Sequence, residues 1–538
     1  MHSLRRLSSL DSIALWLLVV VAALSISCTA TPDSRDTSRL IAGVIAPLET
    51  VNEVLSLGGS FNGAVFDQLF LSLVDEEPDF QSGPLTFTPR LATSWEFSDD
   101  RLQLTFQLRD DVVWSDGTPL TAEDVRYTWQ AQISEHTGYG YAFAKETIRD
   151  VEVVDPHTVR FHYDEPSGTQ FVDAVDGVIL PKHKWGELPF EQWREQPEWF
   201  TENLVTSGPY MLENWKPAVS FELRANPLYY EEGLPKIERI LFREVSETSS
   251  LFSQLLAGEL DFIQTMRPAD IAEAEAREDL QVLTHDQRQY TFISWNVGKP
   301  LFEDPTVRNA MTLAIDRDAI IETLWLGYAN PGVTPVLSST WAAHPDIAPL
   351  PYDPDQAGQL LDEAGWTDSD GDGVRDKDGV DFSFELATNT GNPQRWDTIQ
   401  MVQAQLAKIG VQVKPARYDL PTINARTQAH DFDAAVIGLL IDTTLDNTVT
   451  LKGDATYNFG QYADAEMDQL LDEYAAALDK GAAIEKIHRI QEIFHRDQPM
   501  SVLWEPLGIR GLSANLKNAT PSSSSDLWRL RHWEWSQD

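Results

Sequence analysis

Cysteine is almost absent from this chain, which has only Cys28 in 538 residues. A disulfide bond within the chain is therefore excluded, and packing has to hold the fold together. Basic residues are also scarce: 41 Lys and Arg stand against 84 Asp and Glu, so the formal net charge is −43. Such a surface repels the phosphates of DNA and RNA, and nucleic acid is not an expected partner.

The sequence also lacks the common catalytic signatures. It has no HExxH, GxSxG, P-loop or GxGxxG motif, each of which carries a known chemistry. The eleven histidines are scattered and form no His/Cys cluster for nickel or zinc. These absences predict a protein that is not an enzyme and requires no cofactor. A secreted glycoside hydrolase stays an alternative, because the many acids supply candidate carboxylates without a recognisable pair.

The apolar run near the N-terminus is short. Ile13–Ile26 has 14 residues, fewer than the roughly 20 of a membrane-spanning helix. Arg5 and Arg6 precede the run and a polar tract follows it, which is the pattern of a secretory signal peptide. We therefore expect residues 1–27 to be a signal peptide and the mature chain to work outside the cytoplasm.

The end of this signal resembles a lipoprotein cleavage box. Leu24-Ser-Ile-Ser-Cys28 matches the box of bacterial lipoproteins, which implies a lipid on Cys28 and a tether over residues 28–38. The chain would then be anchored to the membrane, on the periplasmic side or on the outer face of the cytoplasmic membrane. The alternative is an ordinary signal peptide with an incidental cysteine.

The hydrophobic pattern alternates strands and helices and predicts an α/β fold. Phe382–Thr388, a helix near Gln394–Ile409 and Val411–Arg417 are typical of a strand, a crossover helix and a strand, which imply a mixed or parallel sheet. Asp304-Pro305 and Asp353-Pro354 each predict the start of a helix. The length after residue 27 exceeds what one hydrophobic core usually holds, so two or three domains are expected.

A series of motifs then identifies a family. They occur in one order along nearly the whole mature chain: Pro89–Glu96, Leu104–Arg109, Val113–Val125, Leu180–His183, Ser207–Tyr210, Leu256–Asp261, Trp295–Asn296, Phe302–Arg308, Ala314–Arg317, Tyr352–Pro354, Leu360–Trp366 and Asp497–Pro499. In this order they resemble the extracellular solute-binding proteins of family 5, the peptide- and nickel-type receptors of ABC importers.

The resemblance implies a fold and a domain organisation. The fold is periplasmic-binding-protein-like, of the type II or cluster C kind, with two lobes of mixed sheets joined by a hinge and an extra domain on the first lobe. Lobe I would comprise residues 39–75, 205–290 and 500–538. The extra domain would comprise residues 76–204, and lobe II residues 291–499.

The resemblance also implies a function. The chain would be a monomeric substrate-binding lipoprotein that captures peptides between two closing lobes and delivers them to an ABC permease and ATPase complex. An oligosaccharide receptor of the same fold is an alternative, since 17 tryptophans offer stacking platforms. A chemosensory lipoprotein that binds solute without transport is another.

Seven residues are candidates for ligand contact by the same resemblance. Asp442 stands where peptide-binding members hold the ammonium of the peptide, although Leu439 replaces a frequent tryptophan of the family. Arg395 and Trp396 stand where some members hold the far end or carboxylate of the ligand. The remaining candidates are Trp295, Asn296, Tyr457 and Phe459. A buried aromatic, a surface ion pair or a turn residue is the structural alternative at each position.

One acidic loop matches part of a calcium-binding loop. Asp368, Asp370, Asp372 and Asp376 occupy positions 1, 3, 5 and 9 of the EF-hand pattern, and a glycine occupies position 6. Position 12 is Gly379 instead of the bidentate Glu, so the pattern is incomplete. A structural calcium away from the cleft and a plain hairpin turn are both consistent with it.

Overall fold

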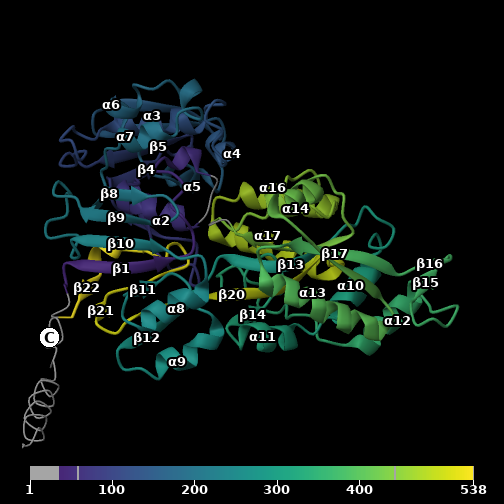
Figure 1. Cartoon of the computed structure of the whole chain (residues 1–538). Helices are drawn as coiled ribbons and strands as arrows, with labels where there is room; N and C mark the ends of the chain where they lie inside the picture. Colours follow the sequence, from purple (N-terminus) through teal and green to yellow (C-terminus); the bar gives the residue numbers. More distant parts are fainter. Residues whose placement is uncertain (1–35, 57–59, 442–443, 537–538) are drawn as a thin grey trace, which may run out of the picture.

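The computed structural model describes residues 36–56, 60–441 and 444–536. Figure 1 shows two bodies side by side, the first with a smaller domain on top of it. The α/β fold with two lobes and an extra domain is confirmed. The candidates Cys28 and Asp442 lie outside the described residues.

Lobe I and the extra domain form the first body. Lobe I contains β1 (Arg39–Val44), α2 (Ser60–Leu69), β8 (Tyr210–Lys216), β9 (Ser220–Ala225), β10 (Arg239–Glu244), α8 (Thr248–Leu256), β11 (Phe262–Ile263), α9 (Ile271–Glu275), β12 (Leu280–Asp286), β21 (Leu516–Lys517) and β22 (Glu534–Trp535). Residues 74–202 contain β2 (Val74–Glu76), β3 (Phe87–Pro89), β4 (Ala92–Phe97), β5 (Gln103–Leu108), α3 (Ala122–Gln132), α4 (Ala142–Lys145), β6 (Ile148–Asp155), β7 (Thr158–Tyr163), α5 (Gln170–Val175), α6 (Lys182–Trp185) and α7 (Glu198–Glu202).

Lobe II forms the second body. Its elements are β13 (Gln289–Trp295), α10 (Pro305–Leu313), α11 (Arg317–Trp325), β14 (Ala329–Pro331), α12 (Pro354–Glu363), β15 (Asp376–Lys377), β16 (Val380–Asp381), β17 (Ser383–Asn389), α13 (Pro393–Leu406), β18 (Gln412–Tyr418), α14 (Leu420–Gln428), β19 (Ala434–Leu440), α15 (Thr448–Leu451), α16 (Ala465–Ala475) and α17 (Lys480–Asp497). The long strand β20 (Met500–Ser513) follows and returns to lobe I.

The local signals in the sequence act as expected. The Asp304 carboxylate accepts the Thr306 amide at the start of α10, and the Asp353 carboxylate accepts the Gln356 amide at the start of α12. Both helices have proline at their beginning, where no amide hydrogen bond is lost. The crossover unit is confirmed, because β17 and β18 pair in parallel with α13 between them.

Strand β20 passes through both lobes. Its first part pairs with β13 and β14 in lobe II, and its second part pairs with β11 and β12 in lobe I. The change occurs at Pro506, which is paired with β14, whereas Leu507 is already paired with β12. Proline cannot donate to a strand ladder, so a change of partners at this residue costs no hydrogen bond from it. The domain boundary expected at residue 500 thus falls at the start of a strand that serves both sheets.

Most of each body has its own hydrophobic cores, although Phe80 of the extra domain packs in a core of lobe II. One core runs through lobe I and the extra domain, with Trp114, Trp185, Trp193 and Trp533 fully buried in it. In lobe II the two faces of β13 serve different cores, because successive side chains of a strand point to opposite faces. Ile293 and Trp295 pack on one face, and Tyr290 and Phe292 pack on the other.

A buried carboxyl lies next to the crossing point. The Glu505 side chain is 3% exposed, and it accepts the Ser338 amide at 3.0 Å and the Ser338 hydroxyl at 2.6 Å. Burial raises the pKa of the Glu505 carboxyl from 4.5 to about 7. A raised pKa in the folded state means that stability is lost as pH rises from 4.5 through 7.

Glu505→Gln is therefore expected to raise the free energy of unfolding at pH 8 by on the order of 2 kcal/mol and to have almost no effect near pH 4.5. Thermal unfolding across this pH range measures the effect. Glu303→Gln is the control, because Glu303 is exposed. A pH profile for Glu505→Gln that runs parallel to that of the unmodified protein would contradict the assignment.

Candidate functional site in the cleft

The carboxyl ends of the parallel strands face each other across the joint between the lobes. In lobe I, β1, β10 and β11 are parallel, and β11 is antiparallel to β20. In lobe II, β17, β18 and β19 are parallel, and β19 is antiparallel to β13, which is itself antiparallel to β20. Because β20 runs from lobe II to lobe I, both sets of parallel strands end toward the opposite lobe. Ligands of open α/β sheets bind outside this edge.

Arg395 lies at this edge of lobe II. It follows β17, close to the N-terminus of α13, and its Nη1 donates to the side-chain oxygen of Asn389, the last residue of β17, at 3.1 Å. Burial lowers the pKa of the Arg395 guanidinium. Among the described residues no carboxylate lies within 4 Å of it. A half-buried cation without a counter-charge is costly, so this position favours an anionic group of a solute.

Gly438 makes room for this arginine. A Cβ atom built on Gly438 would overlap Nη2 of Arg395 and would lie 3.2 Å from Nε2 of Gln289. The end of the guanidinium therefore lies against strand β19 at Gly438. The sequence reasoning missed Gly438 and Asn389. A glycine inside a strand pattern is a signal of close approach, and it could have pointed to Gly438.

Trp396 lies next to Arg395, and its ring is in contact with a second cation. The guanidinium carbon of Arg417 lies 4.0 Å from the centre of the Trp396 ring, a cation–π arrangement. The predicted anchor Asp442 comes shortly after β19, whose last residue, Leu440, is 63% exposed. The structure thus places Arg395, Trp396 and the end of β19 at the edge that faces lobe I.

Trp295 and Asn296 lie at the opposite edge of the same sheet. Trp295 pairs with Ala434, the first residue of β19, and is fully buried, with its indole nitrogen donating to the Ser501 hydroxyl at 2.9 Å. The Asn296 amide donates to the carbonyls of His430 and Phe432 at 3.0 and 2.8 Å. Neither side chain is accessible to a solute here, and we leave both out of the proposed site.

Tyr457 and Phe459 belong to this far edge as well. Their rings are in edge contact, with centres 5.9 Å apart, and the Phe459 carbonyl lies 2.9 Å from Nδ1 of His430, which precedes β19. Phe459 is buried, whereas Tyr457 is exposed. The six candidates that the structure describes therefore divide into two groups at opposite ends of β19, and the structure does not bring the groups together.

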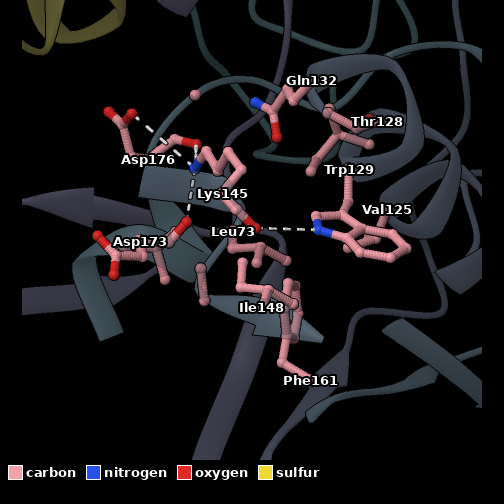
Figure 2. Close-up of a pocket in the computed structure, with 14 residues that line it drawn as sticks. Leu73, Val125, Thr128, Trp129, Gln132, Lys145, Ile148, Phe161, Asp173 and Asp176 are labelled. Atoms are coloured by element: carbon pink, nitrogen blue, oxygen red, sulfur yellow. Dashed lines mark hydrogen bonds and ion pairs between the residues drawn. The ribbon is translucent and has the colours of Figure 1, made fainter. Parts of the chain in front are cut away.

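A pocket in the extra domain has a structural role. Figure 2 shows Lys145 at its centre, with the indole nitrogen of Trp129 directed at the Lys145 carbonyl. The buried Lys145 ammonium donates to the carbonyls of Asp173 and Asp176 at 2.6 and 2.7 Å, at the C-terminal end of α5. A cation at this end of a helix satisfies its last carbonyls. This pocket fixes α5 and lies away from the edge that carries Arg395.

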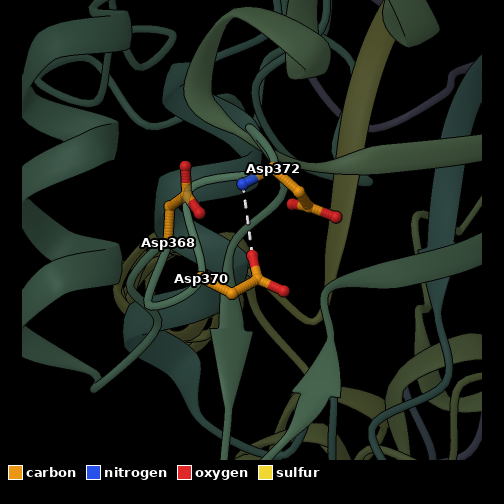
Figure 3. A group of neighbouring side chains, drawn as sticks. All are labelled: Asp368, Asp370 and Asp372. Atoms are coloured by element: carbon orange, nitrogen blue, oxygen red, sulfur yellow. Dashed lines mark hydrogen bonds between the residues drawn. The ribbon is translucent and has the colours of Figure 1, made fainter.

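The acidic loop of lobe II gathers three of its four predicted ligands. Figure 3 shows the carboxylates of Asp368, Asp370 and Asp372 around one turn, and oxygen atoms of the three lie within 4.8 Å of one another. Asp376 is turned away, since its carboxylate accepts the amide and the hydroxyl of Ser369 at 2.8 and 2.9 Å. Gly379 forms the turn of the β15–β16 hairpin with a positive φ of 75°. Loop amides also donate to the three carboxylates.

In the part of the chain that the structure describes, no helix has the length and apolarity to cross a membrane.

Residues 86–459 match the family described as bacterial extracellular solute-binding proteins, family 5. The chain belongs to this family. The family is one of binding proteins, in agreement with the absence of catalytic motifs from the sequence.

Individual relatives match nearly the whole chain. Oligopeptide-binding protein AppA of Bacillus subtilis is 29% identical, over 96% of this chain and 97% of its own length. The solved structure of that protein with a nonapeptide has a TM-score of 0.79 at 28% identity, and it covers 93% of this chain and 99% of the other. NikA of Brucella suis in complex with Fe(III)-EDTA has a TM-score of 0.82 at 20% identity, covers 93% of this chain and 100% of its own, and shares the fold.

Calcium in the acidic loop stays a prediction with a direct test. If the three carboxylates bind the ion, millimolar calcium is expected to raise the melting temperature, because a ligand that binds only the folded state stabilises it. Asp370→Asn should abolish that increase, whereas Asp381→Asn, in the adjoining hairpin, should keep it. A melting temperature that neither calcium nor a chelator changes would make the loop a plain turn.

Proposed function

We propose that this chain is the solute receptor of an ABC importer and that its cargo is a peptide with free ends. The Arg395 guanidinium carries the proposal, because it lies at the edge that faces lobe I and, among the residues that the structure describes, donates only to the Asn389 side chain. A peptide carboxylate supplies the missing charge in a bidentate geometry that suits arginine. The likeness to an oligopeptide-binding protein over nearly the whole chain supports this class of cargo.

The predicted amine anchor completes the arrangement. Asp442 comes two residues after Leu440, the last residue of β19, and the end of β19 lies at the same edge of lobe II as Arg395. One cation and one anion at this edge suit the two ends of a peptide. Closure of lobe I over them removes water and strengthens both charge pairs.

A matched peptide series tests this assignment. Arg395→Ala is expected to lower the affinity for peptides with a free carboxylate by about tenfold or more. The affinity for C-terminally amidated peptides should stay unchanged. Asp442→Ala should do the same for peptides with a free amine, with N-acetylated peptides as the reference. Isothermal titration measures both. Arg426→Ala is the control, because Arg426 already pairs with Glu385 at 2.9 Å.

Two outcomes would contradict this assignment. If both variants lose affinity equally for free and blocked peptides, the two residues pair with each other and not with the cargo. If cello- or xylo-oligosaccharides raise the melting temperature and peptides do not, the receptor binds sugars instead.

The membrane anchor is part of the same proposal. A lipid on Cys28 and the tether 28–38 would keep the receptor close to the permease and ATPase, where a single copy of the chain delivers its cargo. Cys28→Ser is expected to move the protein from the membrane fraction to the soluble fraction after cell lysis, with Ser27→Ala as the control. Unchanged membrane association of Cys28→Ser would contradict the lipid anchor.

A further inference from the structure

The extra domain contacts lobe II at two places that differ in character. The first is the loop between β2 and β3, where Phe80 is 2% exposed and packs in the same core as Tyr290 and Val336 of lobe II. The second is the turn before α5, where Ser167 and Gly168 contact the end of α16. In Figure 1, α5 and α16 lie on the facing sides of the two bodies.

The Phe80 contact lies next to the hinge. The guanidinium carbon of Arg288 lies 4.7 Å from the centre of the Phe80 ring, and Arg288 also pairs with Glu76. Arg288 stands between β12 and β13, the segment that crosses from lobe I to lobe II beside β20. Because this contact is apolar, buried and close to the crossing strands, opening it would expose a core residue. It has the properties of a pivot.

The Gly168 contact is polar and small. The Gly168 amide donates to the Ala475 carbonyl at 2.9 Å, and the Ser167 hydroxyl donates to the same oxygen at 3.2 Å. Ala475 is the last residue of α16, where helix carbonyls have no partner within the helix. Water replaces such hydrogen bonds at little cost, about 1 kcal/mol each. This contact is therefore the one that opens first.

Only glycine fits at position 168. A Cβ atom there would lie 2.5 Å from the Ala477 carbonyl oxygen and 3.2 Å from that of Ala475. Both oxygens are backbone atoms at or just after the end of a helix, so they cannot rotate away as a side chain would. The backbone of the extra domain thus approaches the backbone of lobe II as closely as the chain allows.

The turn is held in shape from the extra-domain side. The Thr169 amide donates to the Ser167 hydroxyl at 3.2 Å, and the Thr169 hydroxyl donates to the Asp173 carboxylate at 2.8 Å. Asp173 lies in α5, whose C-terminal end the buried Lys145 fixes (Figure 2). The hydroxyl and the amide that contact lobe II are therefore positioned before the lobes meet.

The same helix end is connected to the cargo side of lobe II. Tyr474, next to Ala475, donates its hydroxyl to the Thr444 carbonyl at 2.7 Å. Thr444 comes two residues after Asp442, the predicted amine anchor. The end of α16 that receives Ser167 and Gly168 is thus hydrogen-bonded to the segment that follows the predicted anchor.

From these contacts we infer that Ser167 and Gly168 form a latch that locks the extra domain onto the C-terminal end of α16, with Phe80 as the pivot. The latch does not touch the cargo. It sets the balance between the open and closed forms, and a ligand that favours the closed form shifts this balance. The latch itself does not depend on the proposed function, and only its expected effect on peptide affinity rests on it.

Gly168→Ala tests the latch, and Gly358→Ala is the matched control. Gly358 lies in α12, and a Cβ atom there meets only the end of the Arg375 side chain, at 3.4 Å. In the absence of cargo, the amide at position 168 is expected to exchange with deuterium more than about tenfold faster in Gly168→Ala, because its acceptor is lost. The affinity for every peptide that binds should fall by about the same tenfold factor, whether the ends of the peptide are free or blocked.

Ser167→Ala is the second variant, in case Gly168→Ala does not fold. It removes one of the two hydrogen bonds to Ala475, and about fivefold faster exchange at residue 168 is expected. Unchanged exchange in Ser167→Ala or in a folded Gly168→Ala would overturn the latch. If no peptide binds but the exchange rates change as expected, the latch stands and the proposed cargo fails.

Discussion

Strand β20 contributes to both lobes without a break, and the directions of the other strands of the large sheet follow from their pairing with it. Its nearly complete burial reflects its place between neighbours in both sheets. β11 and β13 each run antiparallel to it, and the parallel strands of each lobe follow from these two. The carboxyl edges of lobe I and lobe II therefore face each other as a consequence of how one strand is shared.

The buried arginines show how the chain treats charge inside the fold. Arg308 donates to four backbone carbonyls, and Arg317 is likewise surrounded by carbonyls. Arg90 and Arg531 share the Asp75 carboxylate. In each case, hydrogen bonds or an acid offset the cost of removing the cation from water. Arg395 differs from them, since among the described residues only the Asn389 side chain accepts a hydrogen bond from it and no carboxylate pairs with it. This difference supports its proposed role in binding.

The two contacts between the extra domain and lobe II have different roles in the closure of the lobes. An apolar contact near the crossing strands keeps its geometry while the lobes move, because opening it would expose Phe80 to water. A polar contact far along the chain, at the end of α16, exchanges its hydrogen bonds with water easily. The extra domain is then joined to lobe II by one contact that persists, at Phe80, and one that can be released, at Gly168.

The sequence alone determined the family, the α/β class and the positions of the capped helices, because these depend on local patterns such as Asp-Pro at a helix start. It also indicated Arg395 as a candidate, through the resemblance to the family. Tertiary structure decided which candidates share an edge. Trp295 and Asn296 end a strand just as Arg395 follows one, but β13 runs in the opposite direction to β17, so the two ends point away from each other. Strand direction in a sheet depends on pairing between distant segments, and no local pattern around Trp295 records it.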